Sequence, residues 1–69
     1  MSDDSFNMSL RKFLKTVGVT SQQEIEAAVR AAREAGSLPD GPVTVKAVIT
    51  IEALGLRHDV SGQISTEQD

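Results

Sequence analysis

The hydrophobic residues of this 69-residue chain change their period at one loop, SLPDGP at residues 37–42. Before the loop, apolar residues recur every three or four positions, which is the spacing of one face of an α-helix. After the loop they alternate with polar residues, which is the spacing of a β-strand. The loop holds two prolines and a glycine, residues that interrupt regular structure. The chain is therefore predicted to be an α+β protein whose helices precede its strands.

The segment before the loop is predicted to form two helices, at residues 5–17 and 21–35. The apolar stripe of the first helix comprises Phe6, Leu10, Phe13, Leu14 and Val17. The stripe of the second comprises Ile25, Ala28, Val29 and Ala32. We expect Ser5 to cap the first helix, Gly18 to end it in a left-handed conformation and Gly36 to end the second. Only three residues separate the helices, which predicts a tight helical hairpin.

The segment after the loop is predicted to form a β-hairpin with strands at residues 43–51 and 56–64. Pairing Ile51 with Leu56 places the apolar residues of both strands on one face, whereas a one-residue slip would mix the two faces. This register requires an even number of loop residues. A two-residue loop would put a positive φ on a residue that carries a side chain. We therefore expect a four-residue loop, 52–55, with its glycine in the left-handed position.

The predicted order is α-α-β-β, with both helices packed on the apolar face of the hairpin. We expect one small domain over residues 1–69, with frayed tails at 1–4 and 65–69. A core in so short a chain contributes only about 3–5 kcal/mol. The chain has no cysteine, so it has neither disulfides nor thiolate metal ligands. Further stability is expected from a partner subunit or from very economical packing.

Two segments resemble a family of small bacterial proteins of unknown function: FNMSLRKFLKTVGVTSQQEIEAAVR at residues 6–30 and ITIEALGLRHDVSGQI at residues 49–64. The resemblance implies the α-α-β-β layout and a bacterial cytoplasmic setting. It implies no activity and carries over no functional residues. A cytoplasmic location agrees with the acidic N-terminus, where a signal peptide would be basic. It also agrees with the lack of any apolar run near the ~20 residues of a membrane span.

One hypothesis for the helical half is nucleic-acid binding through residues 10–35, as a helix-turn-helix-like segment. Gln22 and Gln23 could then contact adenine edges in the major groove. The basic residues that could contact phosphate are Arg11, Lys12 and Lys15. However, Ser21 and Glu24 have the spacing of a capping box, which explains the polar run without a ligand. The net charge of -3 also disfavours a polyanionic partner.

No motif in the sequence is typical of catalysis or of cofactor binding. His58 is the single histidine, and its predicted strand neighbours are apolar, so a structural role is expected. We find no nucleophile motif and no glycine-rich phosphate loop. The sequence therefore predicts no enzymatic activity, no cofactor and no metal ion.

Two apolar residues are predicted to lie where water reaches them. Val48 falls on the polar face of the hairpin and Leu54 falls at its tip. A two-stranded hairpin also leaves both strand edges open and is only marginally stable alone. The residues favour a small non-enzymatic module that binds itself or a protein partner through the hairpin edge, with a homodimer as one form. Its candidate surface comprises Val48, Leu54 and His58.

Overall fold

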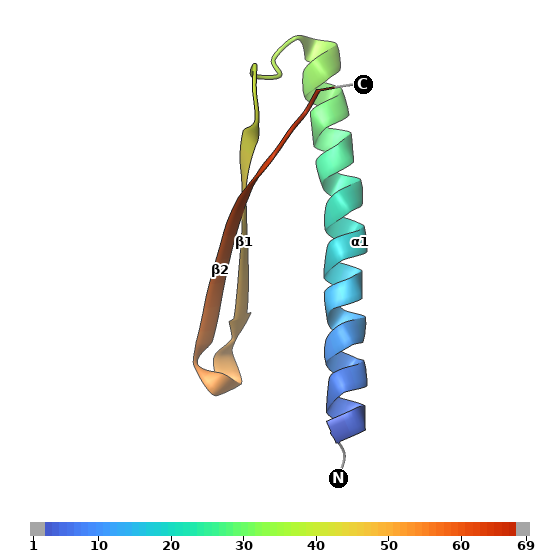
Figure 1. Cartoon of the computed structure of the whole chain (residues 1–69), viewed down its shortest axis with the longest axis vertical. Helices are drawn as coiled ribbons and strands as arrows, with labels where there is room; N and C mark the ends of the chain where they lie inside the picture. The colour runs from blue at the N-terminus through green and yellow to red at the C-terminus, as the bar shows by residue number, and fades with distance from the viewer. Residues whose placement is uncertain (1–2, 68–69) are drawn as a thin grey trace. The chain divides into compact units, whose positions relative to one another are not determined.

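The computed structural model describes residues 3–67, which form one helix followed by two strands (Figure 1). Helix α1 spans Asp3–Ala35, strand β1 spans Val43–Ile51 and strand β2 spans Leu56–Ile64. The chain divides into two compact units, residues 1–38 with the helix and residues 39–69 with the hairpin. The α+β class with helix before strands is confirmed, but one long helix replaces the two that were predicted.

The predicted break between two helices is wrong, because α1 continues through residues 18–20. Gly18, the predicted stop, lacks a positive φ; within residues 3–67 the glycines that have one are Gly36, Gly41 and Gly55. A glycine inside a helix costs about 1 kcal/mol relative to alanine. Ending and restarting a helix is harder, because each end leaves up to four backbone groups without intrahelical partners. The continuous helix keeps these groups bonded.

The two predicted apolar stripes belong to a single stripe. Residues 11 positions apart lie almost above one another on a helix, because 11 residues make about three turns. Phe6, Val17 and Ala28 follow this spacing, and so do Leu14 and Ile25. Two independent helices would have no reason to share this phase. The 11-residue spacing was therefore a signal in the sequence for one continuous helix.

Hydroxyl and amide side chains near the predicted break form hydrogen bonds within α1. The hydroxyl of Thr16 donates to the carbonyl of Lys12 at 3.1 Å, and the hydroxyl of Thr20 donates to the carbonyl of Thr16 at 2.8 Å. The Nε2 atom of Gln22 donates to the Glu26 carboxylate at 3.1 Å, a pair four residues apart on one face. The polar side chains on both sides of the predicted break are thus accommodated by one continuous helix.

The N-terminal caps were also predicted at the wrong places. The helix begins at Asp3, so Ser5 lies within it and is not its cap. The capping box of Ser21 and Glu24 is wrong as well, because both residues lie in the middle of α1, where no helix starts. Of the predicted frayed tails, residues 1, 2, 68 and 69 lie outside the described residues.

The C-terminal end of α1 agrees with the prediction. Gly36 has a φ of 73°, in the left-handed region that a glycine adopts without strain. Its N–H donates to the Arg33 carbonyl at 3.2 Å, and the N–H of Ser37 donates to the Ala32 carbonyl at 2.9 Å. This pair of bonds is a Schellman motif, which satisfies carbonyl groups that the helix end would leave open.

The hairpin has the predicted strands, register and loop. Strands β1 and β2 pair antiparallel with Ile51 opposite Leu56. The loop contains one short 3-10 turn, η1 at Glu52–Leu54, followed by Gly55 with a φ of 62°. The N–H of Gly55 donates to the Glu52 carbonyl at 3.2 Å and closes the turn. Turn chemistry and alternation together therefore predicted this unit correctly.

The register separates the hairpin into two faces. The apolar face carries Val43, Val45, Ala47, Ile49, Ile51, Leu56, His58, Val60, Gly62 and Ile64. The polar face carries Thr44, Lys46, Val48, Thr50, Arg57, Asp59, Ser61 and Gln63. Each face comes from alternate residues of both strands, as the pleat of a sheet requires.

No residue between Asp3 and Glu67 is buried. A single helix has no interior for side chains, and a two-stranded sheet has two faces but no second layer within its own unit. The side chains that are partly shielded are Val17, Ile25, Val29, Ala32, Arg33, Leu38, Val43, Val45, Ile49, Ile64 and Thr66. The described chain thus has apolar faces without a buried core.

Candidate interaction surface

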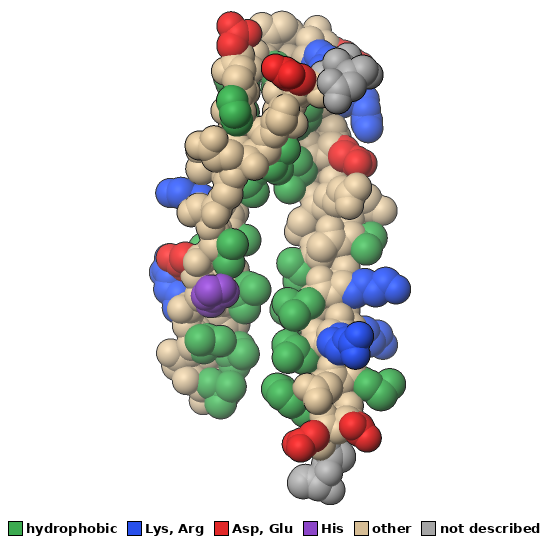
Figure 2. Space-filling model, viewed as in Figure 1, with side chains coloured by type: hydrophobic (Ala, Val, Ile, Leu, Met, Phe, Trp, Pro, Cys, Tyr) green, Lys and Arg blue, Asp and Glu red, His purple; other side chains and the backbone are tan. Residues whose placement is uncertain are grey.

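The apolar stripe of α1 is largely open to water. Phe6 and Phe13 keep 62% and 53% of their surface exposed. The other exposed large apolar residues of the helix are Met8, Leu10, Leu14 and Val19. Figure 2 shows hydrophobic side chains in a column along α1, with basic side chains on another part of its surface. Exposed apolar side chains in such numbers are typical of a surface that another protein covers.

The hairpin exposes the two apolar residues that the sequence singled out. Leu54 lies in the 3-10 turn η1 and is 74% exposed, and Val48 lies on the polar face and is 53% exposed. On the apolar face, Ile51, Leu56 and Val60 are exposed as well. The predicted exposure of Val48 and Leu54 is confirmed.

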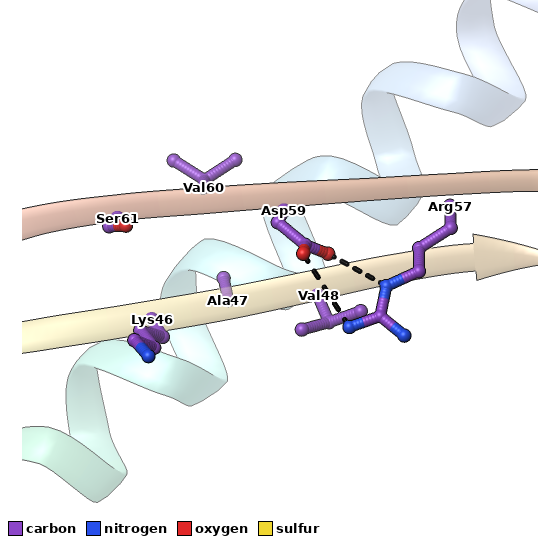
Figure 3. A pocket seen from close by; sticks show the side chains of 7 residues that line it. All are labelled: Lys46, Ala47, Val48, Arg57, Asp59, Val60 and Ser61. Carbon is purple, nitrogen blue, oxygen red and sulfur yellow. Dashed lines mark hydrogen bonds and ion pairs between the residues drawn. The ribbon is translucent and has the colours of Figure 1, made fainter.

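A hollow that Val48 helps to line is formed by residues of both strands (Figure 3). Its volume is about 240 Å³, below the roughly 300–1,000 Å³ of pockets that hold small ligands. Arg57 Nε donates to Asp59 Oδ1 at 3.0 Å, and this ion pair lies beside Val48, which is the cross-strand partner of Asp59. The hollow is lined by Lys46, Ala47, Val48, Arg57, Asp59, Val60 and Ser61.

Both strands of the hairpin are edge strands, because the sheet contains β1 and β2 alone within the described residues. Each strand has nine residues and no proline, so each open edge offers backbone donors and acceptors over about 30 Å. Open edges of this length are usually covered, charged or interrupted. The edges are therefore the second element of a candidate interaction surface.

The three predicted surface residues do not form one patch. Val48 lies on the polar face, whereas His58 lies opposite Ile49 on the apolar face. Leu54 lies between the strands in the turn. His58 has the predicted apolar cross-strand neighbour Ile49, and its side chain is exposed. Within residues 3–67, no group of three or more acidic or histidine side chains is placed to hold a metal ion.

The residues proposed for nucleic-acid contact are all on α1. Arg11, Lys12 and Lys15 are exposed, as are Gln22 and Gln23. The segment from 10 to 35 contains no turn, so its helix-turn-helix-like geometry is wrong. A continuous helix could still contact phosphates through its basic residues, but it has no separate recognition helix. Contact with nucleic acid stays a prediction without that motif.

Sequence reasoning did not predict that large apolar residues of α1 are exposed. It assigned the helical apolar stripe to a core beneath the hairpin and placed the interaction surface on the hairpin alone. The 11-residue phase of the stripe could have revealed a helix about 50 Å long. A nine-residue strand reaches only about 30 Å. Helix α1 is therefore longer than either strand of the hairpin.

In its described part the chain is an α+β protein of one long helix followed by one antiparallel hairpin. Comparison with known proteins adds the family: the model described as "Family of unknown function (DUF6494)" matches residues 1–67. The chain belongs to this family. No curated protein and no solved structure matches it. Over the described residues, no helix combines the length and apolarity that a membrane span requires.

Proposed function

We propose that the chain is a small non-enzymatic module for protein–protein interaction. One observation carries the proposal: eleven large apolar side chains are at least 40% exposed, and no residue between 3 and 67 is buried. Burying a large apolar side chain contributes about 1.5–3 kcal/mol, so the exposed half of each is worth about 1 kcal/mol. Their sum, about 10 kcal/mol, is comparable to the 4–15 kcal/mol that association costs. A stable partner must therefore cover most of these side chains.

The hairpin supports a mode of binding by strand addition. Its edges offer unpaired backbone groups. A third strand could form hydrogen bonds with these groups whatever its side chains are. Val48 and Leu54 then add apolar contacts beside the new strand. The added strand can come from a second copy, giving a four-stranded sheet, or from another protein. Either partner would supply the stability that a two-stranded hairpin lacks.

Sedimentation equilibrium over a wide concentration range tests the proposal. Interference optics are needed, because the chain contains neither Trp nor Tyr. We expect association that persists at high salt, since apolar contacts and backbone bonds are weakly screened. Val48→Lys should weaken it by placing a charge beside the added strand. Thr44→Lys is the matched control, because Thr44 lies on the same face of the same strand but is already polar.

The outcomes separate clearly. Weaker association of Val48→Lys with unchanged Thr44→Lys supports a contact at Val48. Equal association of both variants would remove Val48 from the interface. A chain that stays monomeric at all concentrations and unfolds cooperatively at high temperature would contradict the proposal, since such a chain needs no partner. Binding to nucleic acid, if present, would weaken steeply with salt because condensed counterions are released.

A further inference from the structure

Charged and amide side chains form a row along α1, next to its apolar stripe. The row contains Asp4, Arg11, Lys15, Gln22, Glu26 and Arg33. Its members are separated by 7, 4, 7, 4 and 7 residues, which are steps of about two turns and one turn. The six side chains therefore share one flank of the helix. This row exists only because α1 is continuous, since a break at residue 18 would end its alignment.

The charges of the row are complementary to those of a second copy of the row that runs in the opposite direction. Counting inward from each end, Asp4 corresponds to Arg33 and Arg11 corresponds to Glu26, so an acid meets a base in both cases. Lys15 corresponds to Gln22, so an ammonium group meets an amide. In all three pairs the two residue numbers add up to 37. A second α1 placed antiparallel in this register would set opposite charges beside each other.

The two ends of the apolar stripe are complementary in size. Large side chains occupy its N-terminal half: Phe6, Leu10, Phe13 and Leu14. The C-terminal half carries the small side chains Ala28 and Ala32 beside Ile25 and Val29, and Ala27 and Ala31 flank it. In the same antiparallel register, Phe6 falls opposite Ala31 and Leu10 falls opposite Ala27, whereas Phe13 and Leu14 fall opposite the long polar side chains of Glu24 and Gln23. Large against small keeps two helices evenly spaced, whereas a parallel pair would crowd phenylalanines at one end and leave alanines apart at the other.

We propose that α1 pairs with α1 of a second copy, antiparallel, about a two-fold axis close to Gly18 and Val19. This axis is perpendicular to both helices, so it places the same flank of the two copies side by side. The charged row of one copy therefore lies beside the charged row of the other. A two-fold axis along a parallel pair would instead bring the row against the opposite flank, which carries Ser9, Phe13 and Thr20. Flanking charges commonly set the orientation of paired helices in this way.

The contact is large enough for a specific dimer. A helix of 33 residues is about 50 Å long and about 10 Å wide with its side chains. Contact along its length would bury roughly 500 Å² per copy and about 1,000 Å² in total, the size at which an interface is expected to be biological. Phe6 and Phe13 of both copies would supply on the order of 400 Å² of this area. The proposal rests on the proposed role as an interaction module, but it uses α1 and leaves the hairpin edges free.

Charge reversal tests the register by sedimentation equilibrium at low salt. Because the axis repeats each contact, Arg11→Glu would place like charges at two sites, and Glu26→Arg would do the same. We expect each single variant to weaken the dimer about tenfold. The double variant Arg11→Glu with Glu26→Arg restores both pairs and should return close to the original affinity. Lys12→Glu is the matched control, because it makes the same charge change one position further round the helix from the stripe.

A cysteine pair tests the direction independently, since the natural chain has no cysteine. Arg11→Cys chains mixed with Glu26→Cys chains should form a mixed disulfide under mild oxidation. In a parallel pair, positions 11 and 26 of the two copies would lie 15 residues apart along the helices, which is about 22 Å. The absence of the mixed disulfide would therefore overturn the proposal. A dimer that no α1 variant weakens would also overturn it, and so would a chain that remains monomeric. A dimer weakened only by Val48→Lys would place the interface on the hairpin, so the proposed function would survive while the α1 pairing would fail.

Discussion

Helix α1 and the hairpin expose apolar side chains to a similar degree, but they differ in how many of their backbone groups have hydrogen-bond partners. The helix satisfies its N–H and C=O groups internally except at its ends. The hairpin leaves one edge of each strand without partners. A protein that binds α1 must therefore match its side chains, whereas a protein that binds the hairpin edge can begin with backbone bonds alone. The helix is thus the more selective surface of the two.

Glycine has opposite roles in these two regions. Gly18 lies in the middle of α1 with a helical backbone and open space where a side chain would be. Gly55 has a φ of 62°, which a residue with a side chain adopts only with strain. The helix tolerates its glycine, while the turn requires one. Substitutions at these positions separate the two regions experimentally.

The largest effect is expected from Gly18→Pro. Proline in a helix interior removes one backbone hydrogen bond and clashes with the preceding turn, at a cost of about 3 kcal/mol. The helix should break near its midpoint, and circular dichroism at 222 nm should fall while the hairpin stays intact. Asp3→Pro is the control, since proline is tolerated at the first helical position. Equal helix content in both variants would contradict a continuous α1.

Gly55→Val is expected to have the next largest effect. A β-branched residue in the left-handed region costs on the order of 1–2 kcal/mol, which is comparable to the whole stability of an isolated hairpin. Cross-strand contacts such as Ile51 with Leu56 should weaken in nuclear Overhauser spectra. Gly62→Ala is the control, because Gly62 has no positive φ and nothing lies within 4 Å of an added Cβ. A hairpin unchanged by Gly55→Val would show that another turn type is available.

The hairpin could be predicted completely because its determinants are local. The alternation of apolar and polar residues over nine residues of each strand assigned the side chains to the two faces. The even loop length and the glycine at position 55 then allowed only one register. The helix was predicted less well because a glycine such as Gly18 costs only about 1 kcal/mol inside a helix relative to alanine. A cost this small does not decide whether the helix ends or continues there. Gly18 and Gly36 look alike in sequence, but only Gly36 is followed by a proline-containing loop. Nothing in the residues next to Gly18 forces a stop, and the stripe resumes in phase beyond it.

The candidate surface was predicted in part. Val48 and Leu54 were recognised because each breaks a local pattern, one on a polar face and one in a turn. The exposure of the α1 stripe was not predicted, because an amphipathic helix has the same sequence pattern whether or not its apolar face is covered. The charged row was missed because the assumed break divided it between two helices. The charged row can be recognised only from the helical spacing of residues on both sides of Gly18, and not from any single residue.

The substitution Gly18→Ala is expected to change stability in opposite directions for a continuous helix and for a broken one. In a continuous helix the added methyl group meets nothing within 4 Å, and alanine should stabilise α1 by about 0.5–1 kcal/mol. Two helices joined by a left-handed glycine would instead be destabilised by the same substitution. Thermal unfolding followed at 222 nm measures the sign directly. A lower midpoint for Gly18→Ala would favour the broken helix.

The smallest effect is expected from Asp59→Asn on the hairpin. The ion pair of Arg57 and Asp59 has side chains 68% and 60% exposed, so solvent and salt screen it. Such surface pairs contribute about 0.2–1 kcal/mol, and Asp59→Asn should shift hairpin stability by no more than that. Hydrogen exchange of β2 amides at low and high salt measures the shift, with Ser61→Ala as a control on the same face. A loss well above 1 kcal/mol would show that the pair is covered in solution. The polar face around Val48 would then lie within an interface, and the hairpin would be as selective as the helix.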